Sequence, residues 1–317
     1  MLNIKKSSFL FLFLVTQFAL LNAQTLSTYN FLKLDVDARS SSMAGSFVSM
    51  ENDANLIFYN PAGLSTITSK KASVGFFKYL LDINSGNIAY AQQYKDYGYF
   101  GIGIRYINYG TFDKYDEDLN NLGTFGANDI AISIGYANKY KERFNFGGNL
   151  KYIYSKYDEY GSSAIAFDAG ALVQIPEYLM SVGASVLNAG TQISSYIDTR
   201  EKLPLDVRFG VSKRLEHLPL TINFGLCRLG DDYDKFFSRF KNLIIGGEFN
   251  INEYVDLRIG YNNQQRQDLK TGNSIGLAGF SAGLGIKYEE KYRFDYSFNS
   301  LGKIGSTHRI NIGFNLK

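Results

Sequence analysis

The sequence that decides the fold is Arg309–Leu316, RINIGFNL, close to the C-terminal end of the chain. Its even positions are apolar, and its odd positions are polar or very small. Successive side chains of a β-strand point to opposite faces, so this stretch predicts a strand with one apolar and one polar face. The same alternation recurs from about residue 72 onward. We interpret the stretch as the closing strand of a membrane β-barrel whose apolar face contacts lipid.

Most other strands are predicted from the same alternation. Phe100–Tyr106, Ile130–Tyr136 and Val255–Tyr261 carry apolar residues at every second position, with Gly, Ala, Ser, Arg or Asp between them. Together such segments give about fourteen strands, an even number that suits a bacterial barrel with both termini on the periplasmic side. The predicted fold class is all-β: a transmembrane antiparallel barrel formed by residues 71–317.

The connections between these strands alternate between short and long, which supports a barrel independently. The short ones, expected to face the periplasm, are 93–98, 139–142, 174–178, 213–219, 251–254 and 289–291. The long ones, expected to face outward, are 110–129, 155–164, 187–204, 227–242, 262–279 and 299–308. A large soluble β-sandwich would share the alternation of side chains, but it would not explain this order of loop lengths.

Tyrosines gather at the predicted strand ends, where a ring with a hydroxyl group suits the boundary between lipid tails and headgroups. They are Tyr106, Tyr109, Tyr136, Tyr152, Tyr154, Tyr261, Tyr288 and Tyr292. The mean hydropathy is only −0.16. A low average is expected for a barrel, because its apolar and polar residues cancel.

The first 23 residues predict a secretory signal peptide. Two lysines at positions 5 and 6 precede an apolar run, Phe9–Leu21, and cleavage is expected after Ala23. No later apolar run is long enough for a transmembrane helix. The single Cys227 cannot form an intramolecular disulfide, and a formal net charge of +3 is too small to suggest nucleic acid as a partner.

Residues 24–70 do not alternate, and we expect them to form a plug inside the barrel or a segment at its periplasmic mouth. The most distinctive part is the turn motif Asn60, Pro61, Ala62 and Gly63, because Asn before Pro favours a turn and Gly63 can adopt a positive φ. The glycines of Gly101–Gly103 and Gly283–Gly285 should point inward and make room for a plug or for tight packing.

Ten charged residues are predicted to face the lumen: Arg105, Lys151, Asp168, Asp206, Arg208, Glu248, Asp256, Arg258, Arg293 and Asp295. They could form a polar binding surface or conduit. Both signs are present in equal number, however, and unpaired buried charge is very costly. We therefore favour an ion-pair network that holds the barrel and the plug together.

We expect no catalytic residue, no metal site and no cofactor. The two histidines, His217 and His308, fall in predicted connections, and no Ser/His pair stands at an evident spacing. An outer-membrane hydrolase stays a minor alternative, to be tested by replacing His308 with Ala. The charged residues Arg266, Asp268 and Lys270 mark an outer loop that could face a partner.

Several stretches resemble the PorV/PorQ family of outer-membrane barrels, which are similar to the FadL long-chain fatty acid transporters. Residues 38–45, ARSSSMAG, and Asn60–Leu64, NPAGL, resemble the N-terminal signature of the family. Three later stretches resemble its PorQ branch: LPLDV at 203–207 with SKRL at 212–215, GYN at 260–262 with RQDLK at 266–270, and LAGFS at 277–281 with Gly283 and Gly285.

This resemblance implies a non-enzymatic component of the type IX secretion system in the outer membrane. It implies as partners the attachment-complex proteins PorZ, PorU and PorV, with the barrel holding PorZ through its outer loops. A FadL-like conduit for fatty acids or other hydrophobic molecules is the alternative that the resemblance leaves open.

Overall fold

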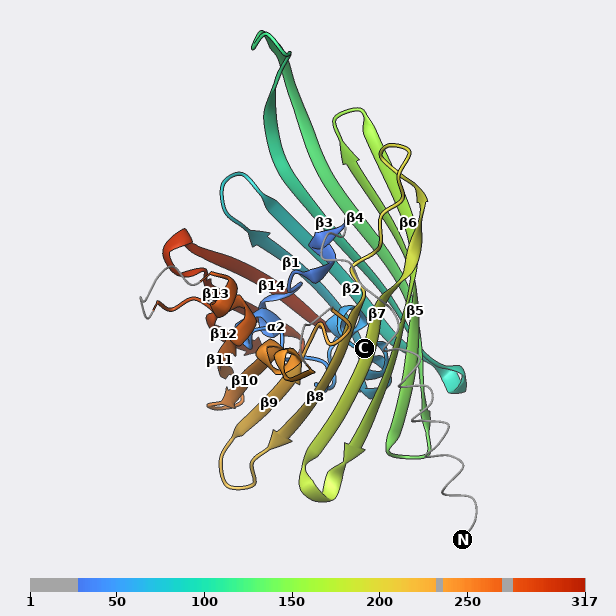
Figure 1. Cartoon of the computed structure of the whole chain (residues 1–317). Coiled ribbons are helices and arrows are strands. Elements are labelled where there is room, and N and C mark those ends of the chain that lie inside the picture. Colours follow the sequence, from blue (N-terminus) through green and yellow to red (C-terminus); the bar gives the residue numbers. More distant parts are fainter. Residues whose placement is uncertain (1–27, 232–235, 270–275, 317) are drawn as a thin grey trace.

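The computed structural model describes residues 28–231, 236–269 and 276–316. In this part the chain forms a closed barrel of fourteen antiparallel strands, in which β1 pairs with β14 (Figure 1). The strands are β1 (Lys70–Lys78), β2 (Asn84–Tyr94), β3 (Gly98–Tyr115), β4 (Asn121–Tyr140), β5 (Phe144–Tyr157), β6 (Tyr160–Ile175), β7 (Met180–Ser194), β8 (Asp206–Arg214), β9 (Leu220–Leu226), β10 (Leu243–Asn250), β11 (Val255–Asn262), β12 (Phe280–Tyr288), β13 (Tyr292–Ser300) and β14 (Ser306–Leu316). The prediction of an all-β barrel with about fourteen strands is confirmed.

The helices are all short. They are η1 (Asn30–Lys33), α2 (Ala38–Ser42), η2 (Ala54–Phe58), η3 (Pro61–Thr66), η4 (Lys95–Tyr97), η5 (Pro176–Tyr178), η6 (Phe236–Asn242), α3 (Asn263–Asp268) and η7 (Gly302–Ile304). Within the described ranges, none of them has the length and the apolar character that a bilayer-crossing helix needs.

The closing strand β14 shows why the alternation fixes the fold. Ile310 is 55% exposed on the outer surface, whereas its neighbours Arg309 and Asn311 are 5% and 3% exposed inside the barrel. Ile310 pairs with Phe76 of β1 on one side and with Tyr296 of β13 on the other, so apolar residues lie next to apolar residues across the ladder. The outward faces therefore form one continuous apolar surface.

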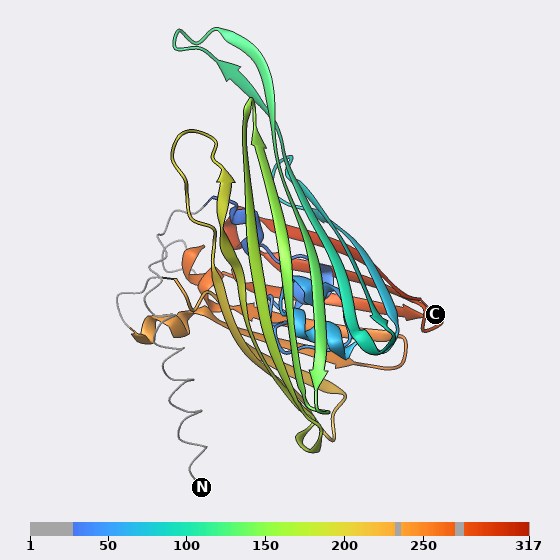
Figure 2. The same ribbon diagram turned by 90° about the vertical axis from the view of Figure 1, so that its right-hand side faces the viewer.

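The two ends of the barrel differ. Short turns join the strands at one end, and the end of β14 lies there because the Asn315 amide bonds to the carbonyl of Glu290 in the β12–β13 turn. At the other end the wall is uneven: β3–β7 have 14 to 20 residues each, and β8–β13 have only 7 to 9. The β3–β4 hairpin projects farthest, as Figure 2 shows.

The prediction of loops is wrong for two of the outer connections. Most of 110–129 and 155–164 is strand, because β3 and β4 continue to Tyr115 and from Asn121, and β5 and β6 continue to Tyr157 and from Tyr160. The polar and glycine-rich composition of these stretches is typical of loops. The chain still pairs there, because a hairpin that stands in water needs no apolar face towards lipid.

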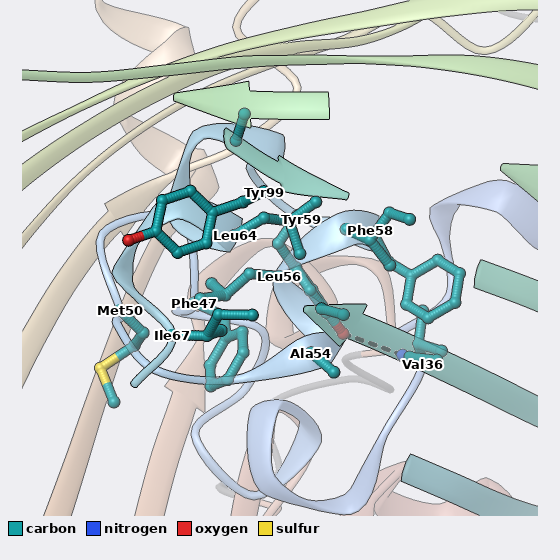
Figure 3. Packing of buried hydrophobic residues seen from close by; sticks show 14 of the residues in the cluster. Val36, Phe47, Met50, Ala54, Leu56, Phe58, Tyr59, Leu64, Ile67 and Tyr99 are labelled. Atoms are coloured by element: carbon teal, nitrogen blue, oxygen red, sulfur yellow. Dashed lines mark hydrogen bonds between the residues drawn. The ribbon is translucent and has the colours of Figure 1, made fainter. Parts of the chain in front are cut away.

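The segment before β1 lies inside the barrel, as the blue helices in Figures 1 and 2 show. We call residues 28–69 the leader. Its core with the wall includes Phe47, Leu56, Tyr59 and Leu64, all at most 1% exposed (Figure 3). The rings of Phe47 and Tyr59 meet edge to face at 5.3 Å, and the Tyr59 hydroxyl accepts the Val36 N–H at 2.8 Å. The hydrophobic core thus lies between leader and wall.

Candidate functional site

The candidate site is the lumen, and the leader is shaped by side-chain caps before it meets the wall. Asp37 caps α2, since its carboxylate accepts the Ser40 N–H at 3.0 Å. Asn60 caps η3 by accepting the Ala62 N–H at 3.1 Å, with Pro61 at the first helical position, where its missing N–H has no cost. Such short helices depend on caps, because they have few internal hydrogen bonds.

The predicted turn motif lies in the middle of this packing. The Asn60 side-chain amide donates to the carbonyl of Val48 at 2.7 Å and to that of Ala171 in β6 at 3.0 Å. All four residues of the motif are buried. The expectation of a positive φ at Gly63 is wrong: Gly63 lies in η3, and a Cβ there would come within 2.8 Å of Leu56. Close packing, and not a left-handed backbone, explains this glycine.

Inward glycines of the wall provide the space that the leader occupies. A Cβ on Gly101 would lie 3.0 Å from Leu64, one on Gly103 would lie 2.7 Å from Phe58, and one on Gly283 would lie 2.3 Å from Ser42. Gly285 serves a different neighbour, because a Cβ there would approach Arg258 at 2.4 Å. At Gly101, Gly103 and Gly283 the leader can lie close to the backbone of the wall, because the wall has no side chain there.

Eight charged side chains form one network where α2 meets β10–β13. Its four carboxylates and four cations are Asp53, Glu248, Asp256, Asp295, Arg39, Arg258, Lys287 and Arg293. Arg39 of the leader holds Glu248 with two bonds, at 2.8 and 2.7 Å, and Asp53 with a third at 2.9 Å. Two bonds in one plane are the strongest carboxylate contact that a guanidinium can make. The network thus ties the leader to β10.

Arg258 is the fully buried cation of this network. Its side chain reaches Glu248 at 2.7 Å, Asp295 at 2.8 Å and Asp256 at 3.4 Å. The partly exposed Arg293 contacts the same three carboxylates. Lys287, which is partly exposed, reaches Asp256 at 2.7 Å. Signs balance within the group, so the charges can be buried.

The other predicted lumen charges lie apart from this network. Lys151 contacts Asp168 at 3.0 Å. Arg208 contacts Asp206 at 2.7 Å. Arg105 contacts carbonyl oxygens instead, and its guanidinium donates to Phe31 and Leu34 at 2.7 Å and to Leu32 at 3.0 Å. All ten predicted residues point into the lumen, but they form separate groups and not one network.

Three members of this network, Arg39, Asp53 and Lys287, are not among the ten charges predicted from the sequence. Arg39 and Asp53 lie in the leader, where no alternation indicates which side chains point at the wall. The one available signal is the cap: Asp53 accepts the Asn55 N–H at 2.9 Å at the start of η2, and Asp or Asn before a short helix is a common cap.

Burial changes the acid–base properties of the leader. Desolvation and the nearby Asp53 raise the pKa of Asp37 to about 6. Desolvation would also raise the pKa of Asp53, but the Arg39 and Arg293 guanidinium groups outweigh it and hold that pKa below its usual value. Asp37 is thus a leader carboxyl without a cationic partner among the contacts described above.

Two cavities of the lumen lie at the short-turn end, and charged side chains contribute to the lining of both. One of about 640 Å³ is lined by Arg39, Asp53, Lys71 and Arg293 and reaches the turns at Glu253 and Glu290. A second of about 350 Å³ touches the β6–β7 turn. On the other side of the leader, a third, beside Phe31 and Arg105, holds only about 10 Å³.

Apolar side chains of the leader fill the lumen towards the long-hairpin end. Tyr29, Phe31 and Leu32 pack against Ile107 and Ile153 of the wall, and all five are buried. A Tyr29–Ser162 hydroxyl contact ties the start of η1 to β6. The apolar space in this half of the barrel is therefore occupied by the chain itself.

Three sequence expectations about individual side chains need correction. His308 lies in β14 and not in a connection; its ring nitrogens contact the Tyr296 hydroxyl at 2.7 Å and the Ser306 hydroxyl at 3.2 Å. A Ser/His pair therefore exists, with a phenol where a hydrolase would need a carboxylate. Tyr109 points inward and donates to Asp129 at 2.6 Å, because it lies on the same face of β3 as the buried Arg105 and Ile107.

The predicted partner-facing residues lie at the long-hairpin end. Arg266 and Asp268 are on α3, where Asp268 accepts from Gln264 at 2.7 Å, and Lys270 lies outside the described residues. Over the described ranges, no group of three or more His, Cys, Asp or Glu side chains is arranged to hold a metal ion.

Several solved structures share this fold. A FadL homologue of Pseudomonas aeruginosa has a TM-score of 0.56 at 9% identity, covering 89% of this chain and 98% of its own. The toluene transporter TodX of Pseudomonas putida has 0.58 at 12%, covering 88% and 97%. The toluene transporter TbuX of Ralstonia pickettii has 0.58 at 10%, covering 87% and 96%. At such identities the likeness shows a FadL-like fold alone. No curated protein sequence matches the chain.

The sequence itself matches a family model described as type IX secretion system protein PorV. The match covers residues 21–188, which is more than half of the chain and includes the leader and the first six strands. A closed barrel with an apolar outer surface is the architecture of bacterial outer-membrane proteins. The chain therefore belongs to the PorV family of type IX secretion system proteins and is an outer-membrane β-barrel.

Proposed function

We propose that the chain is a PorQ-type, non-enzymatic scaffold of the type IX secretion system. In this role it anchors a PorZ-like attachment-complex partner through its outer loops, together with PorU and PorV. The family match supports the secretion system, and the stretches at 203–215, 260–270 and 277–285 support the PorQ branch. The proposal includes a signal peptide at 1–23, a plug at 24–70, a barrel at 71–317, and both termini in the periplasm.

The observation that carries this proposal is the filled lumen. The leader fills the apolar space around Tyr29, Phe31 and Leu32, ion pairs fix it to the wall, and the cavities of about 640 and 350 Å³ lie at the short-turn end. We infer that the ten predicted lumen charges and the Asn60–Gly63 turn hold the leader in place. A barrel that is closed in this way acts through its outer surface.

The direct test is co-purification from detergent extracts of cells that carry a tagged copy of the chain. We expect a soluble surface protein of the secretion system to be recovered with it. Deleting loop 262–279, which holds Arg266, Asp268 and Lys270, should reduce that recovery. The matched control shortens the β7–β8 connection at residues 195–201. Recovery of no secretion component with the intact chain would refute the proposal.

A FadL-like conduit for hydrophobic molecules is the second candidate, and the fold shared with toluene transporters favours it. The packing of Tyr29, Phe31 and Leu32 opposes it, because a hydrophobic molecule would have to displace them. Uptake of labelled fatty acid into proteoliposomes separates the two. The scaffold proposal expects uptake no faster than in protein-free liposomes.

A further inference from the structure

The β3–β4 hairpin extends beyond its neighbours as a two-stranded ribbon. Pairing of β3 with β2 ends at Asn108, and pairing of β4 with β5 ends at Ala127. Beyond these points β3 and β4 pair only with each other, from Thr111–Gly126 to Tyr115–Asn121. We call residues 109–126 the ribbon.

The ribbon stands clear of the membrane-spanning part of the barrel. A tilted strand crosses a bilayer with about 9 to 11 residues, and β3 has 18. At about 3.3 Å per residue, the last seven residues of β3 add roughly 20 Å. The outer edges of β3 at 109–115 and of β4 at 121–125 therefore run through water without a neighbouring strand among the described residues.

The ribbon is held rigid, although an isolated hairpin is only marginally stable. Phe112 and Phe125 stack across it with ring centroids 5.4 Å apart. Lys114 forms an ion pair with Asp158 of the β5–β6 turn, and the Asp158 N–H donates to the Gly126 carbonyl at 3.1 Å. At the tip, Asp116 accepts the N–H groups of Asp118 and Asn120 at 3.0 and 2.8 Å. A preformed edge loses little entropy on binding.

Its side chains combine exposed apolar groups with negative charge. Tyr115, Leu119 and Leu122 are 53%, 80% and 58% exposed. The same segment carries four carboxylates, Asp113, Asp116, Glu117 and Asp118, against one lysine that already has a partner. Apolar side chains can anchor a partner, and the charge determines which partner can approach.

This charge pattern argues for one class of occupant. A second copy of the chain would bring a second acidic ribbon edge to edge, and the like charges would repel. Anionic lipid headgroups would be repelled in the same way. A positively charged protein segment in extended conformation satisfies both the unpaired backbone groups and the carboxylates.

We propose that the ribbon is a docking element for the surface partner beside loop 262–279, and that a basic, extended segment of the partner adds to its edge as a further strand. This inference rests on the proposed scaffold function and specifies the chemistry of the contact. The backbone edge supplies affinity, Leu119 and Leu122 supply apolar anchors, and the carboxylates select a segment rich in Lys or Arg.

The first test replaces residues 111–125 by Asn-Gly, which joins Gly110 to Gly126 through a tight turn. We expect recovery of the co-purifying partner to fall at least tenfold, whereas shortening residues 195–201 should leave it unchanged. Heat-modifiable migration on a gel reports that both barrels are folded. Equal recovery with the short ribbon would overturn the inference but leave the scaffold function standing; no partner with the intact chain would remove both.

The second test keeps the ribbon and removes three of its four carboxylates. It tests the proposed contact even if the chain with the shortened ribbon does not fold. In the triple variant Asp113→Asn, Glu117→Gln, Asp118→Asn, we expect weaker recovery and a flatter dependence on salt, because screened attraction is lost. Asp116 is left in place because it forms the tip.

A photo-crosslinker at position 119 should join the ribbon to a segment of the partner with several Lys or Arg residues. Crosslinks to a second copy of the chain, or only to lipopolysaccharide, would contradict the proposal. A salt dependence of recovery that is unchanged in the triple variant would also count against it.

Discussion

Arg258 is a wall residue that can support the contact between leader and wall indirectly. It bonds three carboxylates from β10, β11 and β13, and Glu248 is also the carboxylate that Arg39 of the leader holds. Without Arg258, the carboxylates would be buried with less compensating charge. The ion pair between Arg39 of the leader and Glu248 of the wall therefore depends on Arg258, although Arg258 is not part of the Arg39–Asp53 ion pair within the leader.

Replacing Arg258 with Met should destabilise the barrel by roughly 3 kcal/mol, because it removes a fully buried cation and leaves four carboxylates with three cations, Arg39, Arg293 and Lys287. The matched change is Lys287→Met, which should cost about 1 kcal/mol or less, since Lys287 is partly exposed and its partner Asp256 keeps two arginines. Urea titration followed by heat-modifiable migration measures both. Equal losses in the two variants would contradict the idea that the fully buried cation contributes more than the partly exposed one.

Asp37 gives the leader a dependence on pH. Burial raises the pKa of Asp37 from 3.8 to about 6. Between these two pH values, the Asp37 carboxyl is protonated in the folded state and ionised in the unfolded state. This contribution to stability is full at low pH and is lost as pH rises from about 4 to about 6. Asp37→Asn keeps an oxygen for the Ser40 N–H and should flatten the profile, raising stability at pH 7 relative to the unchanged chain.

The measurement is the urea midpoint of the intact and variant chains at pH 5 and pH 7.5. The control is Asp82→Asn in the exposed β1–β2 turn, which should leave the profile unchanged. A slope that survives in Asp37→Asn would assign the pH dependence to another group.

At the scale of the element, period-two alternation was sufficient to predict the strands and their faces, because water and lipid require opposite side chains. At Tyr109 the alternation was right, since this residue lies on the inner face with Arg105 and Ile107, and the expectation that its ring meets the lipid boundary was wrong. Alternation failed at the β3–β4 ribbon, whose two faces both meet water. There the surroundings that decide the fold are ones that the local sequence does not show.

Neighbouring glycines in β10 offer a matched test of how the wall receives the leader. A Cβ on inward Gly246 would lie 2.8 Å from the Cβ of Met43, whereas one on outward Gly247 would have its nearest neighbours at 3.6 Å. Gly246→Ala should destabilise the protein by about 1–3 kcal/mol through overpacking. Gly247→Ala should be neutral or slightly stabilising, because Ala is less flexible when unfolded. The urea midpoints of both variants measure the difference, and equal effects would mean that the leader yields easily.

At the scale of the whole molecule, the sequence left two places for the leader, in the lumen or at the mouth. The reason is physical: a segment of short helices has no periodicity that points to its neighbour. Inward glycines such as Gly101 and Gly283 were the useful signal, because they marked space that something had to fill. Which leader residue fills each space depends on contacts across more than a hundred residues, such as Arg39 with Glu248.

The filled lumen predicts that the intact protein does not conduct ions in a planar lipid bilayer. At the level of the leader, a Cβ on Gly103 would lie 2.7 Å from Phe58 and one on Gly283 would lie 2.3 Å from Ser42, so leader and wall are in close contact there. The double variant Arg39→Ala, Asn60→Ala removes bonds from the leader to β10 and β6 and should produce conducting events, while Lys71→Ala at the rim of the large cavity should not. Steps as large as those of an open porin from the intact chain would show that the leader is not a seal.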